Sequence, residues 1–412
     1  MDDEKNAKGE HSALLMPQFE EFEQRAEILG ELHARPFEKI SQPRRVFLLA
    51  FLTDKEDEQS EREMVNALCA AQGMAPPAEL SNYHSLSIGQ WNFRWERHNE
   101  FTAYRWDTED KETDEGFDFS ADYGARLLSE LNFQPPGKLI VATQIRLTQF
   151  KRSPEEYESF FNPNSFCMIE TDHGKGRVAT DFQVDTMGFT RFVIEDHGMS
   201  EYRAGALVQR VLEVETYRTL ALLGLPVAKK AMPVVNMAQD GLAQLTAEIA
   251  QAQSIEDNHR LLNKMTDLAA KLEAQAAATS FRFAASLAYH EIVMSRLGVM
   301  NETPIEGARR FSSFFRRRLD PAISTCRMVE ERQTSLSRKL MRTAELLRTR
   351  IQFELEQQNR DLLDSMNRRA RLQLRLQRTV EGLSVAAVSY YIVGLIKYMI
   401  EGLDKSGLIF GL

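Results

Sequence analysis

The chain has 412 residues, 43% of them hydrophobic, and a formal net charge of −9, so it can bury a full core and is too long for one simple domain. Its acidic sequence pI of about 5.6 argues against nucleic acid as a partner. Its cysteines, Cys69, Cys167 and Cys326, are odd in number and form no CxxC pair, which argues against a disulfide framework or a structural zinc site and fits a reducing compartment.

The N-terminal segment, residues 1–16, is predicted to be a disordered tail. It begins MDDEKNAKGEHSALL and has no basic stretch followed by an apolar run, so we predict no secretory signal and expect the bulk of the chain in the cytoplasm. Residues 17–34 have the composition of a polar helix. Pro36 would end this helix, because the residue before a proline disfavours helical backbone angles.

Residues 17–235 are predicted to form an α+β cytoplasmic body. Between about 44 and 198, β-branched or aromatic runs are bounded by Gly, Asn, Pro or Asp, a pattern typical of strands. These runs are RRVFLLAFL, SLSIGQWNFRWE, FTAYRW, KLIVATQIRL, FCMIE, RVATDFQV and FTRFVIE. Helical spacing occurs within DKEDEQSEREMVNALCAAQG and ADYGARLLSELNF. The body is therefore expected to combine strands with helices between them.

Two polar clusters in this body are candidates for a site. The stretch ELHARPFE precedes the first strand, and RWERHNEF follows the start of a strand over 91–96, whose tryptophans would face the core and whose polar side chains would face the other way. Together they offer a base, a carboxylate and a fixed cation, which suit acid/base catalysis, anion binding or, with further carboxylates, a metal. The candidates are His33, Arg35, Glu96 and His98. The alternative is structural, since a cation in the last turn of a helix complements its carbonyl end.

From about residue 200 the sequence is almost entirely helical, and residues 236–381 are predicted to form a helical hairpin or stalk. No proline follows Pro321 and no glycine occurs until Gly382, so one continuous helix is predicted from about Ala322 to Ile400. It carries an apolar stripe with steps close to an 11-residue repeat: Leu340, Ala344, Leu347, Ile351, Leu355, Leu362 and Met366. The stripe packs either on residues 240–300 of the same chain, as an antiparallel hairpin, or on other subunits, as a coiled-coil stalk.

Residues 382–400, GLSVAAVSYYIVGLIKYMI, are predicted to form a transmembrane helix, followed by a short tail at 401–412. Nineteen helical residues reach roughly 28 Å, close to the roughly 30 Å hydrocarbon core of a bilayer. Five arginines precede the segment, namely Arg368, Arg369, Arg371, Arg375 and Arg378. Such a flank places the N-terminal body on the cytoplasmic side of a bacterial inner membrane. The alternative is a buried core helix.

Several segments together resemble a known family. They are ELHARPFE, RWERHNEF, YRAGALVQRVLEVETYR, RRRLDPAISTC and RRARLQLRLQRTVEGLSVAAVSYYIVGLI. The chain is similar in these segments to the bacterial domain of unknown function 3422 family, described as membrane-anchored proteins. The resemblance implies a cytoplasmic body, a long helix and a C-terminal membrane anchor, and it implies no activity.

Three classes of function remain open from the sequence. The first is a membrane-anchored structural or interaction protein, with the lipid bilayer, an unidentified protein and a second copy of the chain as partners. The second is an oligomeric ion transport protein, similar in architecture to the CorA family of magnesium channels, although the GMN signature of that family is missing. The third is an enzyme that uses the His/Arg/Glu cluster. The common nucleotide, zinc-protease and hydrolase signatures are absent, so we predict no cofactor and no metal site.

Overall fold

The computed structural model describes residues 38–405, apart from 79–80, 111–118, 120–132 and 158, together with residues 22 and 25. The predicted tail at 1–16, nearly all of the helix predicted at 17–34 and most of the helix predicted in ADYGARLLSELNF lie outside the described residues. The chain divides into two compact units. The first comprises 1–231 and 279–330, and the second comprises 232–278 and 331–412.

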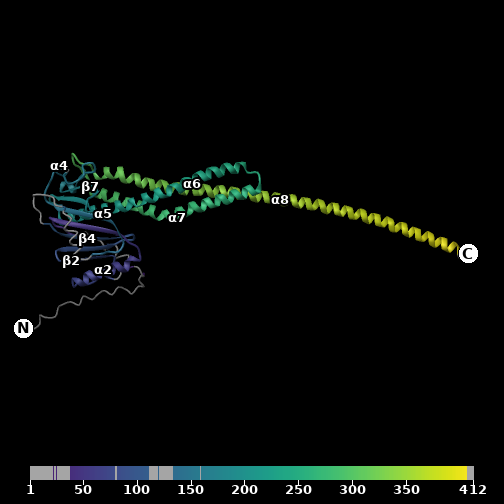
Figure 1. Cartoon of the computed structure of the whole chain (residues 1–412), viewed down its shortest axis with the longest axis horizontal. Helices are drawn as coiled ribbons and strands as arrows, with labels where there is room; N and C mark the ends of the chain where they lie inside the picture. The colour runs from purple at the N-terminus through teal and green to yellow at the C-terminus, as the bar shows by residue number, and fades with distance from the viewer. Residues whose placement is uncertain are drawn as a thin grey trace, which may run out of the picture. The chain divides into compact units, whose positions relative to one another are not determined.

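The first unit is built on one sheet (Figure 1), to which nine strands of the described residues contribute in the order β2-β3-β4-β1-β5-β8-β7-β6-β9. Neighbouring strands are antiparallel, except that β5 and β8 are parallel. The strands are β1 (Arg44–Leu52), β2 (Tyr83–Ile88), β3 (Trp91–Arg97), β4 (Phe101–Glu109), β5 (Lys138–Thr148), β6 (Cys167–Thr171), β7 (Gly176–Val184), β8 (Thr190–Asp196) and β9 (Thr303–Pro304).

The predicted α+β class is confirmed, because a mixed sheet body is followed by long helices. One predicted run differs from the structure: SLSIGQWNFRWE contains two strands, β2 and β3, rather than one. Gly89 separates them with a φ of +58°, a left-handed conformation that glycine adopts without steric cost. The two strands therefore form a tight hairpin instead of one long strand.

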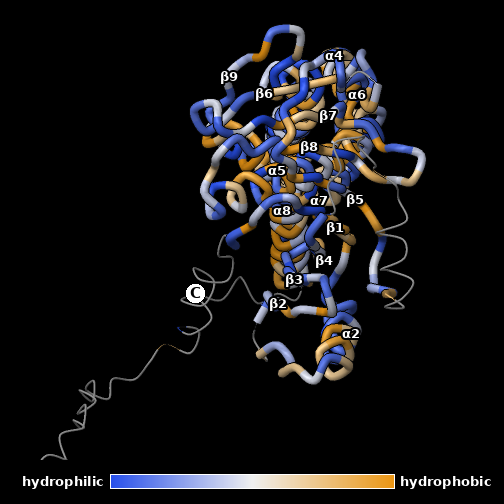
Figure 2. The backbone as a smooth tube through the Cα atoms, turned by 90° about the vertical axis from the view of Figure 1, so that its left-hand side faces the viewer, coloured by the Kyte–Doolittle hydropathy of each residue, from blue (hydrophilic) through white to orange (hydrophobic). Residues whose placement is uncertain are grey.

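The helices are α2 (Asp57–Ala71), α4 (Pro154–Tyr157), α5 (Glu201–Leu222), α6 (Gly224–Gln251), α7 (Ile255–Met300) and α8 (Phe311–Lys405), with a 3-10 turn at Asp172–Gly174. Figure 2, coloured by hydropathy, shows both hydrophobic and hydrophilic residues along α2. A helix with one buried face needs such a mixture, with its apolar residues on one side. Glu61, Val65 and Cys69, spaced four residues apart, are the buried positions of α2.

Alternation along the strands gives the sheet two different cores. On β1, Val46, Leu48 and Ala50 belong to a cluster that includes much of α5, whereas Phe47 and Leu49 belong to another cluster on the opposite face. The second cluster is aromatic and contains all three tryptophans of the chain. Its largest members are Trp91, Phe93, Trp95, Tyr104 and Trp106. The predicted inward face of the 91–96 strand is thus confirmed.

The first turns of α8 complete the first core. Phe311, Phe315 and Leu319 are each at most 2% exposed within it. The helix was predicted to begin after Pro321 but begins at Phe311, with Pro321 inside it. Burial of the phenylalanines holds these turns in helical form despite the proline. The cysteines Cys69, Cys167 and Cys326 are also buried and unbridged.

The second unit consists of the remaining parts of α6, α7 and α8, which contact one another through side chains. The Arg332 guanidinium donates to Asn236 Oδ1 at 2.9 Å, and Asn258 Nδ2 donates to Glu354 Oε1 at 3.1 Å. The Arg350 Nη2 donates to the Ala252 carbonyl at 2.9 Å, just beyond the end of α6. Such a contact satisfies a carbonyl that has no partner within its own helix.

The long helix α8 runs without a break from Phe311 to Lys405, 95 residues. This confirms the predicted continuity over 322–400. In the second unit its apolar stripe is buried through Leu340, Leu347 and Ile351. From Leu355 onward the large apolar side chains of α8 are exposed, because α8 continues past the α6–α7 turn without a neighbour (Figure 1).

Candidate functional site

The predicted site residues fall partly outside the described residues. His33 and Arg35 are not described, so the convergence of all four candidates stays a prediction. Glu96 and His98 do lie together at the end of β3, with 3.9 Å between His98 Nε2 and Glu96 Oε2. The His98 ring stacks on Phe101 with 4.1 Å between ring centroids. The imidazole is therefore held by an aromatic ring on one side and lies near a carboxylate.

Glu38, the last residue of ELHARPFE, was not singled out from the sequence but lies at the centre of this region. Its carboxylate pairs with the guanidinium of Arg94 and, at 3.1 Å, with that of Arg105. Its backbone is placed by α5: a Cβ at Gly205 would lie only 1.8 Å from the Glu38 carbonyl oxygen. The glycine therefore lets the segment approach α5 closely enough for Glu38 to reach the sheet.

Three of the segments that carried the family resemblance thus meet. Glu38 comes from ELHARPFE, Arg94 and Glu96 from RWERHNEF, and Gly205 from YRAGALVQRVLEVETYR. Glu38 and Arg94 are more than fifty residues apart, and Arg94 and Gly205 are more than one hundred apart. Spacing along the sequence could therefore not predict that these segments meet. The only signal in the sequence was that each segment mixes charged residues with glycine or aromatic residues.

The charges at this place are buried and balanced. Arg94 and Arg105 face each other across β3 and β4, and each is only 4% exposed. Burial by itself lowers the pKa of Arg94, but the nearby carboxylate of Glu38 raises it, and the overall pKa is raised. Asp107 accepts from Arg44 Nε at 2.6 Å and from Arg105 Nη2 at 3.2 Å. Carboxylates thus hold Arg94 and Arg105 in place, which suits a rigid network.

A small cavity lies beside Glu96 and His98. Its volume is about 30 Å³, and α5 contributes Gln209, Glu213 and Tyr217 to its lining. A cavity of this size accommodates a water molecule, whose share of liquid volume is about 30 Å³. It has no room for an organic substrate. The described part of the predicted cluster thus fits a hydrated polar pocket better than a substrate site.

No group of three or more His, Cys, Asp or Glu side chains with the spacing of a metal site occurs among the described residues. His33, which could supply a further ligand, lies outside the described residues.

Two buried carboxylates were missed in the sequence. Glu195 on β8 is 0% exposed and accepts from Tyr157 Oη at 2.8 Å and from the Arg152 backbone N–H at 2.9 Å. Glu61 on α2 is also 0% exposed and accepts from Thr102 Oγ1 at 2.7 Å. Burial raises the pKa of both carboxyl groups. The signal that could have found Glu61 is its position on the apolar stripe of α2, four residues before Val65.

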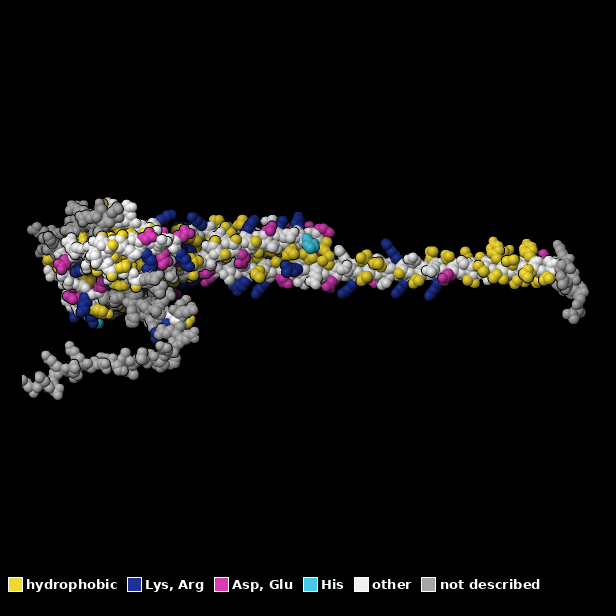
Figure 3. Space-filling model, turned by 90° about the horizontal axis from the view of Figure 1, so that it is seen from below, with side chains coloured by type: hydrophobic (Ala, Val, Ile, Leu, Met, Phe, Trp, Pro, Cys, Tyr) yellow, Lys and Arg dark blue, Asp and Glu magenta, His cyan; other side chains and the backbone are white. Residues whose placement is uncertain are grey.

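The C-terminal part of α8 is a second candidate functional surface. The five predicted arginines are exposed, and four of them, at 368, 371, 375 and 378, recur every three or four residues and so share one helix face. Leu372, Leu376 and Val380 are exposed on a different face. Figure 3 shows Lys and Arg side chains projecting from this stretch and hydrophobic side chains gathered after it.

Two helical stretches are long and apolar enough to cross a membrane, by length and composition only. One is Glu201–Gln251, in whose most apolar window 33% of the residues are buried inside the protein. The other is Phe311–Leu403, in whose window none is buried. The apolar residues of the first stretch are partly buried in the core that α5 joins. The apolar window of α8 contains no residue that other described residues bury.

The sequence profile of a family described as "Protein of unknown function (DUF3422)" matches residues 20–411, nearly the whole chain. No curated protein and no solved structure matches it.

Proposed function

We propose that this chain, which belongs to the DUF3422 family of proteins of unknown function, is a membrane-anchored protein of the bacterial inner membrane. Residues 382–400 of α8 would cross the bilayer, and the sheet-containing unit would lie in the cytoplasm and bind another protein. The observation that carries the proposal is the exposure of an apolar segment of bilayer length on an unbroken helix.

Most of the exposed side chains of this segment are large and apolar or aromatic. They are Leu383, Val385, Val388, Tyr390, Tyr391, Ile392, Val393, Leu395, Ile396, Tyr398, Met399 and Ile400. Contiguous apolar patches beyond a few hundred Å² are rare on soluble monomers, because apolar surface in water is costly. A helix also satisfies its own backbone groups, which a bilayer demands. Lipid is thus the environment that fits this segment best.

The arginines before the segment support the orientation. They carry no ion pair among the described residues, in contrast to most arginines of the sheet unit. Cationic side chains near the anionic cytoplasmic leaflet are attracted by about 1 kcal/mol each. Basic flanks also stay on the cytoplasmic side during insertion. The four arginines that share a face would meet the headgroups together.

The test of the anchor is removal of residues 380–412, compared with removal of 406–412 alone as the control. We expect the longer deletion to move the protein from the membrane pellet to the soluble fraction with the sheet unit still folded, as judged by tryptophan fluorescence. The shorter deletion should leave the protein in the pellet. A 380–412 deletion that stays in the pellet after a high-salt wash would contradict the single-anchor proposal.

The test of orientation replaces the five arginines by glutamate, with five lysines as the control. We expect the glutamate variant to insert poorly or in the inverted direction, because its flank would repel the anionic leaflet. The lysine variant should behave as the natural chain. Protease protection of the sheet unit in sealed vesicles measures the topology of both variants. Unchanged topology in the glutamate variant would remove the support for a cytoplasmic body.

We further propose that the exposed part of the stripe on α8 joins a second copy of the chain. Its basis is that the stripe is covered as far as Ile351 and continues uncovered through Leu355, Leu362 and Met366. The full chain in detergent should be a dimer or larger by light scattering, and Leu362→Glu with Met366→Glu should weaken the association. A monomer would contradict the proposed association. A closed ring of subunits would instead favour the ion transport alternative.

A further inference from the structure

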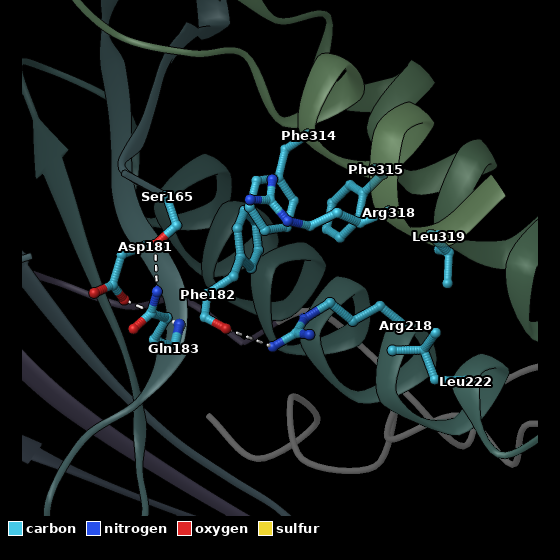
Figure 4. A pocket seen from close by; sticks show the side chains of 10 residues that line it. All are labelled: Ser165, Asp181, Phe182, Gln183, Arg218, Leu222, Phe314, Phe315, Arg318 and Leu319. Atoms are coloured by element: carbon cyan, nitrogen blue, oxygen red, sulfur yellow. Dashed lines mark hydrogen bonds between the residues drawn. The ribbon is translucent and has the colours of Figure 1, made fainter. Parts of the chain in front are cut away.

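A cavity of about 230 Å³ lies in the first unit, away from the charged network described above (Figure 4). Its walls come from β7, the last turns of α5 and the first turns of α8. The lining includes the apolar residues Phe182, Leu222, Phe314 and Phe315 and the charged residues Asp181, Arg218 and Arg318.

A bulge in β7 shapes one wall of the cavity. Thr180 pairs with Phe192 of β8, but the next pair is Val184 with Thr190, so β7 contains two more residues than β8 between the pairs. Phe182 lies within the bulge and has a φ of +55°. A bulky side chain in this left-handed region is strained and persists only where its surroundings impose it. Bulges of this kind redirect a side chain.

Aromatic packing supplies the surroundings that hold Phe182. Its ring stacks on Phe314 with 4.7 Å between centroids and meets Phe311 and Phe315 edge-on at 5.0 and 4.9 Å. The rings of Phe182 and Phe315, with the side chain of Leu222, give the cavity an apolar interior. An apolar wall that contacts no protein atoms forfeits dispersion contacts, which the apolar body of a ligand would restore.

The two arginines of the cavity differ in their partners. Arg218 is neutralised, because its Nε and Nη2 atoms reach both carboxylate oxygens of Glu215 at 2.6 and 2.5 Å. Arg318 has no ion pair among the described residues, and its guanidinium carbon lies 4.3 Å from the centroid of the Phe314 ring. Figure 4 shows the Arg318 side chain extending along the phenylalanine rings of the cavity. The lining also contains Asp181, whose carboxylate accepts hydrogen bonds from the backbone N–H groups of Asn162 at 2.9 Å and Gln183 at 3.0 Å. Arg318 is thus the guanidinium of the lining with which no carboxylate of the described residues pairs.

We propose that this cavity binds a small organic carboxylate, with the carboxylate on Arg318 and an apolar body against Phe182, Phe315 and Leu222. A guanidinium presents paired N–H donors that match the two oxygens of a carboxylate. Because Arg318 has no ion pair among the described residues, its guanidinium can pair with one ligand carboxylate. Ligand cavities usually measure about 300–1,000 Å³, so this smaller one suits a ligand of the size of benzoate rather than a nucleotide or a long acyl chain.

The experiment uses the full chain in lipid nanodiscs and titrates three probes: benzoate, its neutral analogue benzyl alcohol, and inorganic phosphate. Binding is followed by the broadening of the probe's NMR signals, with the empty nanodisc as blank. We expect benzoate to bind at least tenfold more tightly than benzyl alcohol or phosphate, because only benzoate satisfies both the apolar wall and the guanidinium.

Variants assign the binding to the cavity. Arg318→Gln should weaken benzoate at least tenfold and leave benzyl alcohol unchanged, while Leu222→Phe, which fills the cavity, should weaken both. Arg317→Gln removes a neighbouring exposed arginine outside the lining and should change neither. If Arg318→Gln fails to fold, Arg318→Lys, which keeps the charge and loses the paired donors, should give an intermediate benzoate affinity.

Four results would overturn the proposal. They are no binding of benzoate to the natural chain, equal affinities for benzoate and benzyl alcohol, a benzoate affinity that is unchanged by Arg318→Gln or Arg318→Lys, and an equal loss in Arg317→Gln. The last result would mean that the general positive charge of the helix, and not the cavity, attracts the anion.

Discussion

The sheet unit and the end of α8 differ in the burial of their apolar side chains and in the pairing of their arginines. In the sheet unit Trp95 and Tyr104 are 0% exposed, and the charges of Arg94 and Arg105 are matched by carboxylates. On α8 after residue 382, tyrosines and aliphatic side chains are exposed, and the arginines before them have no carboxylate partner among the described residues. The sheet unit thus buries its aromatic rings and pairs these charges within the chain, whereas the end of α8 exposes apolar side chains that the chain does not cover.

The largest expected effect of this difference is on stability. Phe93→Ala in the aromatic core should lower the free energy of unfolding by about 3–5 kcal/mol, because it leaves a cavity among closely packed rings. Leu372→Ala on the exposed part of α8 should change it by at most about 0.5 kcal/mol. Denaturant titration followed by tryptophan fluorescence measures both, since all three tryptophans belong to the core that Phe93 occupies. Equal costs would mean that the two regions are not distinguished by packing.

The next effect concerns insertion. Val388→Arg places a charge near the middle of the apolar segment and should disfavour insertion by about 2.5–3.5 kcal/mol. Leu374→Arg, which adds the same charge to the same helix before the segment, should leave the protein in the membrane fraction. Quantitative fractionation of cells that express each variant gives the comparison. Loss of membrane association in both variants would indicate a general effect of charge on α8 and not a span.

A third comparison uses glycines. Gly205→Ala should destabilise the sheet unit by about 1–3 kcal/mol, because the new Cβ would meet the Glu38 carbonyl oxygen at 1.8 Å and force the segments apart. Gly382→Ala on α8 meets nothing within 4 Å and should favour the helix by roughly 1 kcal/mol. Thermal unfolding of the matched pair measures the difference. If Gly205→Ala proves neutral, Glu38 is not held by its approach to α5.

Local pattern predicted much of the fold, because the period of a strand or helix is written in neighbouring residues. The run RRVFLLAFL coincides with β1, and the absence of proline after Pro321 and of glycine before Gly382 predicted that α8 is continuous, although not where it begins. What could not be predicted depends on residues far apart. The parallel pairing of β5 with β8 and the bulge at Phe182 are properties of two strands together.

The same distinction applies to the candidate site. Glu96 and His98 were found because they are two residues apart in RWERHNEF, Glu96 on the polar face of the predicted strand and His98 just after it. Glu38 was missed although it belongs to the same quoted motif as His33, because its role depends on Arg94, Arg105 and the close approach at Gly205. Whether His33 and Arg35 join them remains a prediction.

The smallest expected effect is a pH dependence. Burial raises the pKa of Glu61 above its ordinary value of 4.5, so the folded state binds this proton more tightly than the unfolded state. The stability that it contributes is fully present below about pH 4.5 and is lost as the pH rises through the raised pKa. Glu61→Gln should therefore flatten the fall in unfolding free energy above pH 4.5.

Exposed Glu356 on α8 serves as the control for this measurement, because Glu356→Gln should leave the slope unchanged. Unfolding free energies measured at several pH values between 4.5 and 7 give the slopes. A steeper slope in Glu61→Gln would contradict a raised pKa of Glu61 in the folded state.

The burial of all three cysteines has a consequence for oxidative stress. Oxidants such as hydrogen peroxide react with the nucleophilic thiolate and not with the thiol. Burial raises the pKa of Cys69, Cys326 and Cys167, the last to about 12, so the thiolate is scarce at neutral pH, and none of the three sulfurs is presented at the surface. The protein therefore contains no thiol suited to act as a peroxide sensor, and oxidising conditions that inactivate proteins with exposed thiolates should leave its own cysteines reduced.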